Sequence, residues 1–155
     1  MKCCVKGLMK TDASWSALIG RLTLALVMLP HGLQKTIGAF GGYGFEGTMG
    51  FFTGTLGLPT VIAFLVIMAE SVGAIALAVG FFTRFCAGSL AVVMVGAAMM
   101  GHAKNGFFIN WAGNQAGEGI EFHVLAIGLA LALVVSGAGR FSIDGALVNR
   151  GCCSK

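Results

Sequence analysis

Glu70 lies near the middle of an apolar stretch, residues 60–82, whose only other polar members are Thr60 and Ser71. About 20 apolar residues in a helix are enough to cross the hydrocarbon core of a bilayer, so this stretch is predicted to span a membrane. An ionisable group at that depth costs roughly 2.5–3.5 kcal/mol on insertion scales. A carboxylate retained there is expected to have a partner, to face a cavity or to take part in chemistry.

A second charged side chain, Arg21, lies within the first apolar stretch, residues 13–34. At 1.5 Å per residue, Arg21 is roughly 12 Å from the inner end of its helix, and Glu70 is roughly 15 Å from the outer end of its own. In a core about 30 Å thick, the two depths nearly coincide. We therefore expect Arg21 and Glu70 to form an ion pair, which would either fix helix register or tune a proton or substrate site.

The three histidines all fall at the outer ends of apolar stretches, level with a lysine and a further glutamate. Because helix ends on one side of a bundle converge, these side chains are predicted to share an outward-facing cavity. Imidazole and carboxylate groups there could ligate a metal, carry protons, hydrogen-bond to a quinone-like head group, or simply be solvated. The five residues are His31, Lys35, His102, Glu121 and His123.

A metal site is the least favoured of these alternatives. Glu121 and His123 are two residues apart and point to different sides of a helix, so one helix cannot present both to a cavity. The chain also lacks a His-Glu-x-x-His or Glu-x-x-His pair, and we predict no metal site. The candidates for catalytic proton transfer or head-group contact are Glu70, Arg21, His31, His102 and Glu121. The weaker candidates for cofactor contact are His31, Lys35 and His123.

The composition places these residues in a membrane protein. Hydrophobic residues make up 57% of the chain and charged residues only 10%, whereas a soluble domain carries about a quarter charged residues. The apolar stretches recur without a linker, so we expect one unit embedded in the lipid bilayer of the cell membrane. The net charge of +4 comes from basic residues near the ends of these stretches. That position favours anionic lipid, not nucleic acid, as their partner.

Four membrane-spanning helices can be drawn, which predicts an all-α fold, a transmembrane four-helix bundle. Asp12 is the expected N-cap of the first helix, Pro59 precedes the second, and Pro30 is expected to kink or end the first. Apolar residues at helical spacing between spans one and two predict a short interfacial helix or a lid. The spans are residues 13–34, 60–82, 85–102 and 119–137, and the apolar stripe is Phe45, Met49, Phe52 and Leu56.

The distribution of lysine and arginine predicts the orientation. With both termini and the turn at residues 83–84 on one side, that side holds seven basic residues, and the other side holds Lys35 and Lys104. The positive-inside rule then places both termini in the cytoplasm. We expect a cytoplasmic tail at residues 1–12, a membrane domain at residues 13–147 and a second cytoplasmic tail at residues 148–155. The seven residues are Lys2, Lys6, Lys10, Arg84, Arg140, Arg150 and Lys155.

Cysteine pairs occur near both ends of the chain, which this topology places on one side. They could bind a soft metal, undergo reversible oxidation or carry a lipid, but plain reduced thiols are the simpler interpretation. No Cys-x-x-Cys motif is present, so a thioredoxin-type redox pair is not indicated. The residues are Cys3, Cys4, Cys152 and Cys153.

The order and spacing of the polar residues over residues 16–147 resemble the DoxX family of small four-helix membrane proteins. The resemblance rests on an arginine in the first span, a His-Gly pair followed by a lysine, and a glutamate in the second span followed by glycine and arginine. It continues with an Asn-Gly pair, a further glutamate and a closing glycine-rich run. These residues are Arg21, His31, Gly32, Lys35, Glu70, Gly80, Arg84, Asn105, Gly106, Glu121 and residues 137–144.

The resemblance implies a membrane component of an oxidoreductase, associated with thiosulfate-to-quinone electron transfer or with partners that handle superoxide and thiols. It makes Arg21, His31, Lys35, Glu70, Arg84 and Glu121 candidate functional residues. We therefore expect the membrane subunit of an oxidoreductase system, with a bound quinone as the suggested cofactor and a redox protein as partner. Whether the chain is itself an enzyme stays open.

One alternative function is a small-solute or proton-coupled carrier, which with four spans would need a homo-oligomer. The other is a non-catalytic scaffold for a soluble enzyme.

Overall fold

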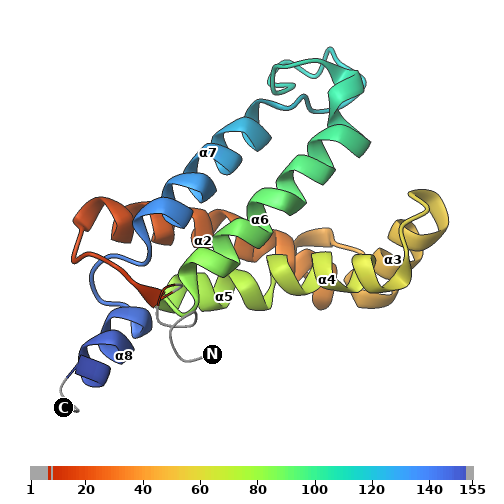
Figure 1. The fold of residues 1–155 in the computed structure, drawn as a ribbon. Helices are drawn as coiled ribbons and strands as arrows, with labels where there is room; N and C mark the ends of the chain where they lie inside the picture. The colour runs from red at the N-terminus through yellow and green to blue at the C-terminus, as the bar shows by residue number, and fades with distance from the viewer. Residues whose placement is uncertain (1–6, 8, 153–155) are drawn as a thin grey trace.

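The computed structural model describes residue 7 and residues 9–152, with side chains up to residue 148, and the regular structure in this part of the chain is helical throughout. Figure 1 shows two layers that meet at one end and diverge toward the other: α2 with α4 and α5, and α6 with α7. The elements are α2 (Trp15–Thr36), η1 (Ala39–Gly41), α3 (Gly44–Gly50), η2 (Phe51–Thr55), α4 (Thr60–Glu70), α5 (Val72–Val79), α6 (Thr83–Ala97), η3 (Ala98–His102), η4 (Ala103–Asn105), α7 (Glu121–Ser136) and α8 (Ile143–Cys152).

Three helices are long and apolar enough to cross a membrane. They are α2, the combined α4 and α5 over Thr60–Val79, and Thr83–Asn105, in which η3 and η4 extend α6. Helix α7 is also apolar but has 16 residues, about 24 Å at 1.5 Å per residue. Large apolar side chains cover the outside of the helices, and Leu26 and Val92 are both 74% exposed. A surface of this kind suits contact with lipid.

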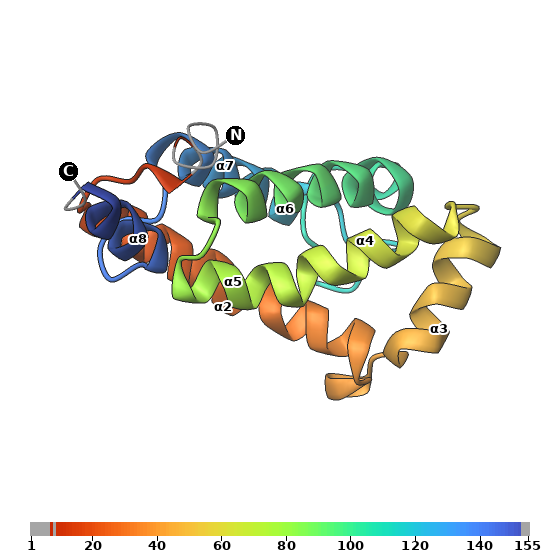
Figure 2. The same cartoon turned by 60° about the horizontal axis from the view of Figure 1, so that its bottom comes forward.

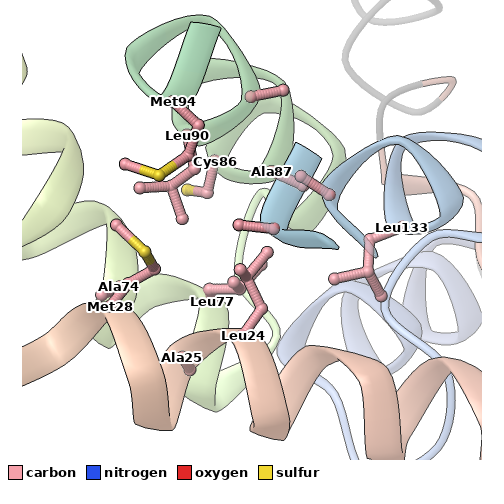
Figure 3. Close-up of a cluster of buried hydrophobic side chains, with 13 residues drawn as sticks. Leu24, Ala25, Met28, Ala74, Leu77, Cys86, Ala87, Leu90, Met94 and Leu133 are labelled. Atoms are coloured by element: carbon pink, nitrogen blue, oxygen red, sulfur yellow. The ribbon is translucent and has the colours of Figure 1, made fainter. Parts of the chain in front are cut away.

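The core lies where the two layers meet and combines leucines and methionines with small residues (Figure 3). Leu24 of α2, Leu77 of α5 and Leu90 of α6 are buried in the same cluster. Ala74 and Ala87 are completely buried beside them. Small residues at these contacts let the helices approach closely, which is how helices associate where lipid gives no hydrophobic drive.

The second predicted span is interrupted at Ser71, between α4 and α5. Ser71 departs from regular helical angles (φ −99°, ψ −75°), and its hydroxyl donates a 2.6 Å hydrogen bond to the carbonyl of Ile67. Serine bonding of this kind tends to bend helices. The single helix expected over residues 60–82 is therefore two shorter helices, the second of which ends at Val79. The distortion directly follows Glu70.

Helix α2 begins and ends at different residues from those predicted. Ser14, not Asp12, is the N-cap, and its hydroxyl accepts from the amide of Ala17. At the other end the helix continues past Pro30 to Thr36, so Pro30 does not end it. The extra turn matters because it includes Lys35.

The segments just before α2 and just after α7 meet at one end of the bundle, which we call the terminal end. The amide of Gly139 donates to the hydroxyl of Thr11 (2.7 Å). The turn between α5 and α6 lies there too, because both carboxylate oxygens of Asp144 accept from the amides of Phe82 and Thr83 (2.8 and 2.9 Å). The segment before α2, the segment after α7 and this turn therefore lie together, as the predicted topology requires.

The short helix predicted between the first two spans is present as α3 and its π-helical continuation η2. The ring of Phe45 packs edge-on against Phe64 of α4, with 6.3 Å between centroids. In Figure 2, α3 and η2 lie at the end opposite α8, and we call the end with α3 and η2 the cavity end.

The predicted roles of the four terminal cysteines fall outside the part of the chain whose side chains the structure describes.

Candidate functional site

A cavity of about 710 Å³ lies at the cavity end, where the layer of α6 and α7 diverges from α4 (Figure 1). Helices α2, α4, α6 and α7 line it together with η2 and η3. A mostly apolar cavity of this size with a few polar groups is typical of sites for organic ligands. The ionisable side chains in its wall are His31, Lys35, Glu70, His102, Glu118 and His123.

Glu70 is paired with Lys35. The ammonium nitrogen of Lys35 lies 2.5 Å from Oε2 of Glu70, and the two side chains are 22% and 4% exposed. Lys35 occupies the last turn of α2, where the free backbone carbonyls favour a cation. The pair neutralises a carboxylate that would be costly alone in a membrane. Because both residues line the cavity, both can contact a ligand.

Gly32 permits this pairing by letting two backbones approach closely. A Cβ atom at Gly32 would lie 2.3 Å from the carbonyl oxygen of Glu70 and 2.6 Å from Cα of Ser71. Real Cβ contacts are never this short. Gly32 lies one turn before Lys35, so its lack of a side chain brings the lysine within reach of the carboxylate.

Replacing Gly32 with alanine is expected to push α2 away from α4 and to weaken the Lys35–Glu70 pair. Overpacking of this kind costs about 1–3 kcal/mol, so the midpoint of thermal unfolding in detergent should fall. Gly128→Ala in α7 is the matched control, because within the described part of the chain no atom lies within 4 Å of a Cβ at Gly128. Equal unfolding midpoints for the two variants would contradict the role given to Gly32.

The rings of His102 and His123 pack against each other in the cavity wall, with 4.3 Å between their centroids and 45° between their planes. Nδ1 of His102 lies 3.0 Å from the carbonyl oxygen of Glu118. Because a carbonyl oxygen can only accept, this bond requires a proton on Nδ1, and Nε2 of the neutral ring is then an acceptor. His123 is 6% exposed, and its Nδ1 has no hydrogen-bond partner among the residues that the structure describes. The pair therefore has hydrogen-bonding capacity left for a ligand.

The cavity unites four of the five outer residues that were predicted to share one, and Glu121 is the exception. Oε2 of Glu121 accepts from the amide of Ile109 (3.0 Å). This carboxylate holds the loop before α7 and does not line the cavity. The expectation that Glu121 shares the cavity was wrong, because its carboxylate is hydrogen-bonded to the loop amide of Ile109 instead. The four residues in the cavity wall are His31, Lys35, His102 and His123.

Arg21 does not pair with Glu70, so the predicted ion pair between them is wrong. Its guanidinium donates to the carbonyls of Leu77 and Ala78 at the end of α5 (3.3 and 2.8 Å) and to two carbonyls of the loop before α8 (both 3.2 Å). Leu77 lies seven positions after Glu70, roughly 10 Å further along a helix. Carbonyls at a helix C-terminus lack helical donors and favour a cation, which explains the preference of Arg21.

Two other residues of the DoxX-like pattern also belong to the terminal end. Gly80 adopts φ 70° and lies so close to Arg21 that a Cβ would be 2.6 Å from its Nη1. Arg84 donates to the carbonyls of Val134 (2.6 Å) and Lys10 (3.1 Å). These residues join helices and do not line the cavity.

Sequence reasoning missed two features of the cavity. Glu118 was not identified, although its carbonyl fixes the proton on His102. The apolar wall on α6 and η3 was also missed, although Val92, Gly96 and Met100 recur every four residues and so share one helix face. Among residues 7 and 9–152, no group of three histidine, cysteine, aspartate or glutamate side chains is placed to hold a metal ion.

The chain is similar to a family of known proteins and to individual curated proteins. The DoxX family model matches residues 16–103, more than half of the chain. "Inner membrane protein YphA" of Escherichia coli (strain K12) is 30% identical over 132 residues, which cover 82% of this chain and 86% of that protein. "Putative oxidoreductase CatD" of Bacillus subtilis (strain 168) is 27% identical over 127 residues, covering 82% and 83%. No solved structure matches the chain significantly.

The apolar helices and the inner-membrane relative define a multi-pass protein of the cell membrane. The chain belongs to the DoxX family. The resemblance and the membrane location predicted from the sequence are thereby confirmed.

Proposed function

We propose that this DoxX-family protein is the membrane subunit of an oxidoreductase system and binds a quinone beside Lys35 and Glu70. The observation that carries the proposal is an ion pair between a buried carboxylate and a partly buried ammonium group in the wall of a largely apolar cavity. A quinone has the matching chemistry, because its ring carries carbonyl acceptors and its tail is apolar. The name of the Bacillus relative, "Putative oxidoreductase CatD", supports the same broad class.

The proposed arrangement in the membrane has four spans, with α7 as the fourth. Both chain ends lie in the cytoplasm, since Arg84 and Arg140 belong to the terminal end and basic residues prefer that side. The cavity then faces the outside, with α3 and η2 in the outer interface. Residues 1–12 and 148–155 form the cytoplasmic tails.

The residues of the cavity fit a quinone head group. An ammonium group has three N–H donors, and Glu70 engages one donor of Lys35, so Lys35 can also donate to a quinone carbonyl. Nε2 of His102 can accept from the hydroxyl of a quinol. Glu70 and His31 are the groups of the cavity wall that we propose move protons to or from the head, because carboxylates and imidazoles are common general acids and bases.

A quinone takes up two electrons and two protons when it is reduced to the quinol. We propose that a reduced redox protein supplies the electrons and that the acid and base groups of the cavity hold the protons. Lys35 keeps the head in place through its ammonium group. Glu70 balances that charge and keeps Lys35 directed into the cavity.

Chemical analysis of the purified protein tests this proposal. Protein isolated in a mild detergent is expected to give an organic extract with close to one quinone per chain, together with the ultraviolet absorption of a quinone. Gly128→Leu, which alters an exposed position of α7 outside the cavity wall, is expected to retain the same content. Quinone no more abundant than in a mock purification from the same membranes would contradict the proposal.

A further inference from the structure

We infer that the bound quinone enters the cavity sideways from the bilayer, between α4 and α6, and that its hydrocarbon tail remains in this opening. The inference rests on the proposed function and adds the orientation and the class of the ligand. The ligand is a membrane-dissolved amphiphile with a hydrogen-bonding head, not a small water-soluble molecule.

The first support is a set of side chains that line the cavity and are also exposed on the outside of the helices. Ile62 of α4 is 45% exposed, Val92 of α6 is 74% exposed and Met100 of η3 is 46% exposed. All three line the cavity. In a membrane-spanning helix, an exposed apolar side chain faces acyl chains. Residues that face both the cavity and the lipid mark an opening that connects the cavity with the bilayer.

Gly96 lies at this opening and leaves it wide. It lies four residues after Val92 and four before Met100, on the same face of the helix, and it lines the cavity. No atom of the described residues lies within 4 Å of a Cβ built at Gly96, so the protein leaves room for a ligand beside it. Glycine inside a helix is less stable than alanine, so helix stability does not account for this residue.

The distribution of polar groups sets the direction of the ligand. Lys35 and Glu70 provide the charged part of the wall, and His102 provides a further acceptor. The part of the wall formed by Val92, Gly96 and Met100 is apolar. A polar head therefore binds at the ion pair, and the tail lies along this apolar stripe and passes into the bilayer without crossing water.

A Gly96→Leu variant tests the inference, because a leucine fits the empty space and would obstruct the tail alone. Protein in lipid nanodiscs would be titrated with ubiquinone bearing a long isoprenoid tail and with its tailless head, 2,3-dimethoxy-5-methyl-1,4-benzoquinone. We expect affinity for the tailed quinone to fall roughly tenfold, the effect of losing about two buried methylene groups. Affinity for the tailless head should stay within about twofold of wild type.

Gly128→Leu is the matched control, because its position in α7 is equally open but does not line the cavity. It should leave both affinities unchanged, and unfolding midpoints will show that both variants fold. Equal losses for both probes in Gly96→Leu, or no loss for either, would overturn the lateral route while leaving the proposed function intact. Failure of wild type to bind either probe would refute the proposed function, and the inference with it.

Discussion

Replacing Arg21 with alanine is expected to destabilise the fold by roughly 3 kcal/mol or more, since hydrogen bonds to charged groups contribute about 1.5–3 kcal/mol each. Arg21 is 1% exposed, and its guanidinium joins α2 to the end of α5 and to the loop before α8. Removal leaves carbonyls without this donor at the terminal end, where the segments before α2 and after α7 meet. Thermal unfolding in detergent, followed by circular dichroism, measures the effect.

Two further variants test whether the effect depends on the shape of the Arg21 guanidinium and whether it is specific to a buried arginine. Arg21→Lys keeps the charge but loses the planar fork that reaches both sets of carbonyls, so an intermediate loss is expected. Arg140→Ala removes an exposed arginine whose Nε donates to the carbonyl of Ala13, and its effect should stay within about 1 kcal/mol. If Arg21→Ala unfolded like wild type but bound no quinone, Arg21 would belong to the site after all.

The second large effect is expected at the Lys35–Glu70 pair, and the two residues should respond unequally. Lys35→Met leaves a carboxylate that is 4% exposed without a partner, a change that typically costs about 3–5 kcal/mol. Glu70→Gln leaves Lys35, whose long side chain can turn toward the membrane surface, so the expected loss is about 1–3 kcal/mol. Both variants should bind quinone roughly tenfold more weakly, which corresponds to about 1.4 kcal/mol.

The double variant Lys35→Met/Glu70→Gln distinguishes stability from binding. Removing both charges takes away the uncompensated carboxylate, so the unfolding midpoint should rise above that of Lys35→Met. Quinone binding should stay weak, because the ammonium donor is still missing. Wild-type quinone affinity in the double variant would exclude the pair from the binding site.

The membrane fold and most of the ionisable residues of the cavity wall could be predicted from the sequence. Apolar stretches of helical length identify spans directly, because the bilayer imposes one length on all of them. The convergence of helix ends was enough to group His31, Lys35, His102 and His123. The terminal position of the turn before α6 followed from the alternation of spans.

The partners of Glu70 and Arg21 could not be predicted in the same way. Counting residues gives depth only to within a helical turn, and it assumes that each span is regular. Ser71 distorts the second span, and α2 runs past Pro30, which brings Lys35 to Glu70. Arg21 donates to backbone carbonyls. Because every residue has a backbone carbonyl, no sequence motif identifies the ones that it contacts. The sideways opening likewise depends on the angle between the two layers.

The infrared difference spectrum of bound quinone upon reduction tests the contact between Lys35 and the head group most directly. In wild type at saturating quinone, we expect the carbonyl stretching band to lie below that of the same quinone free in lipid, because an ammonium donor weakens the carbonyl bond. In Lys35→Met the band should return toward the free position. A bound quinone whose carbonyl band is the same in both proteins would contradict the central claim that this ion pair holds the ligand.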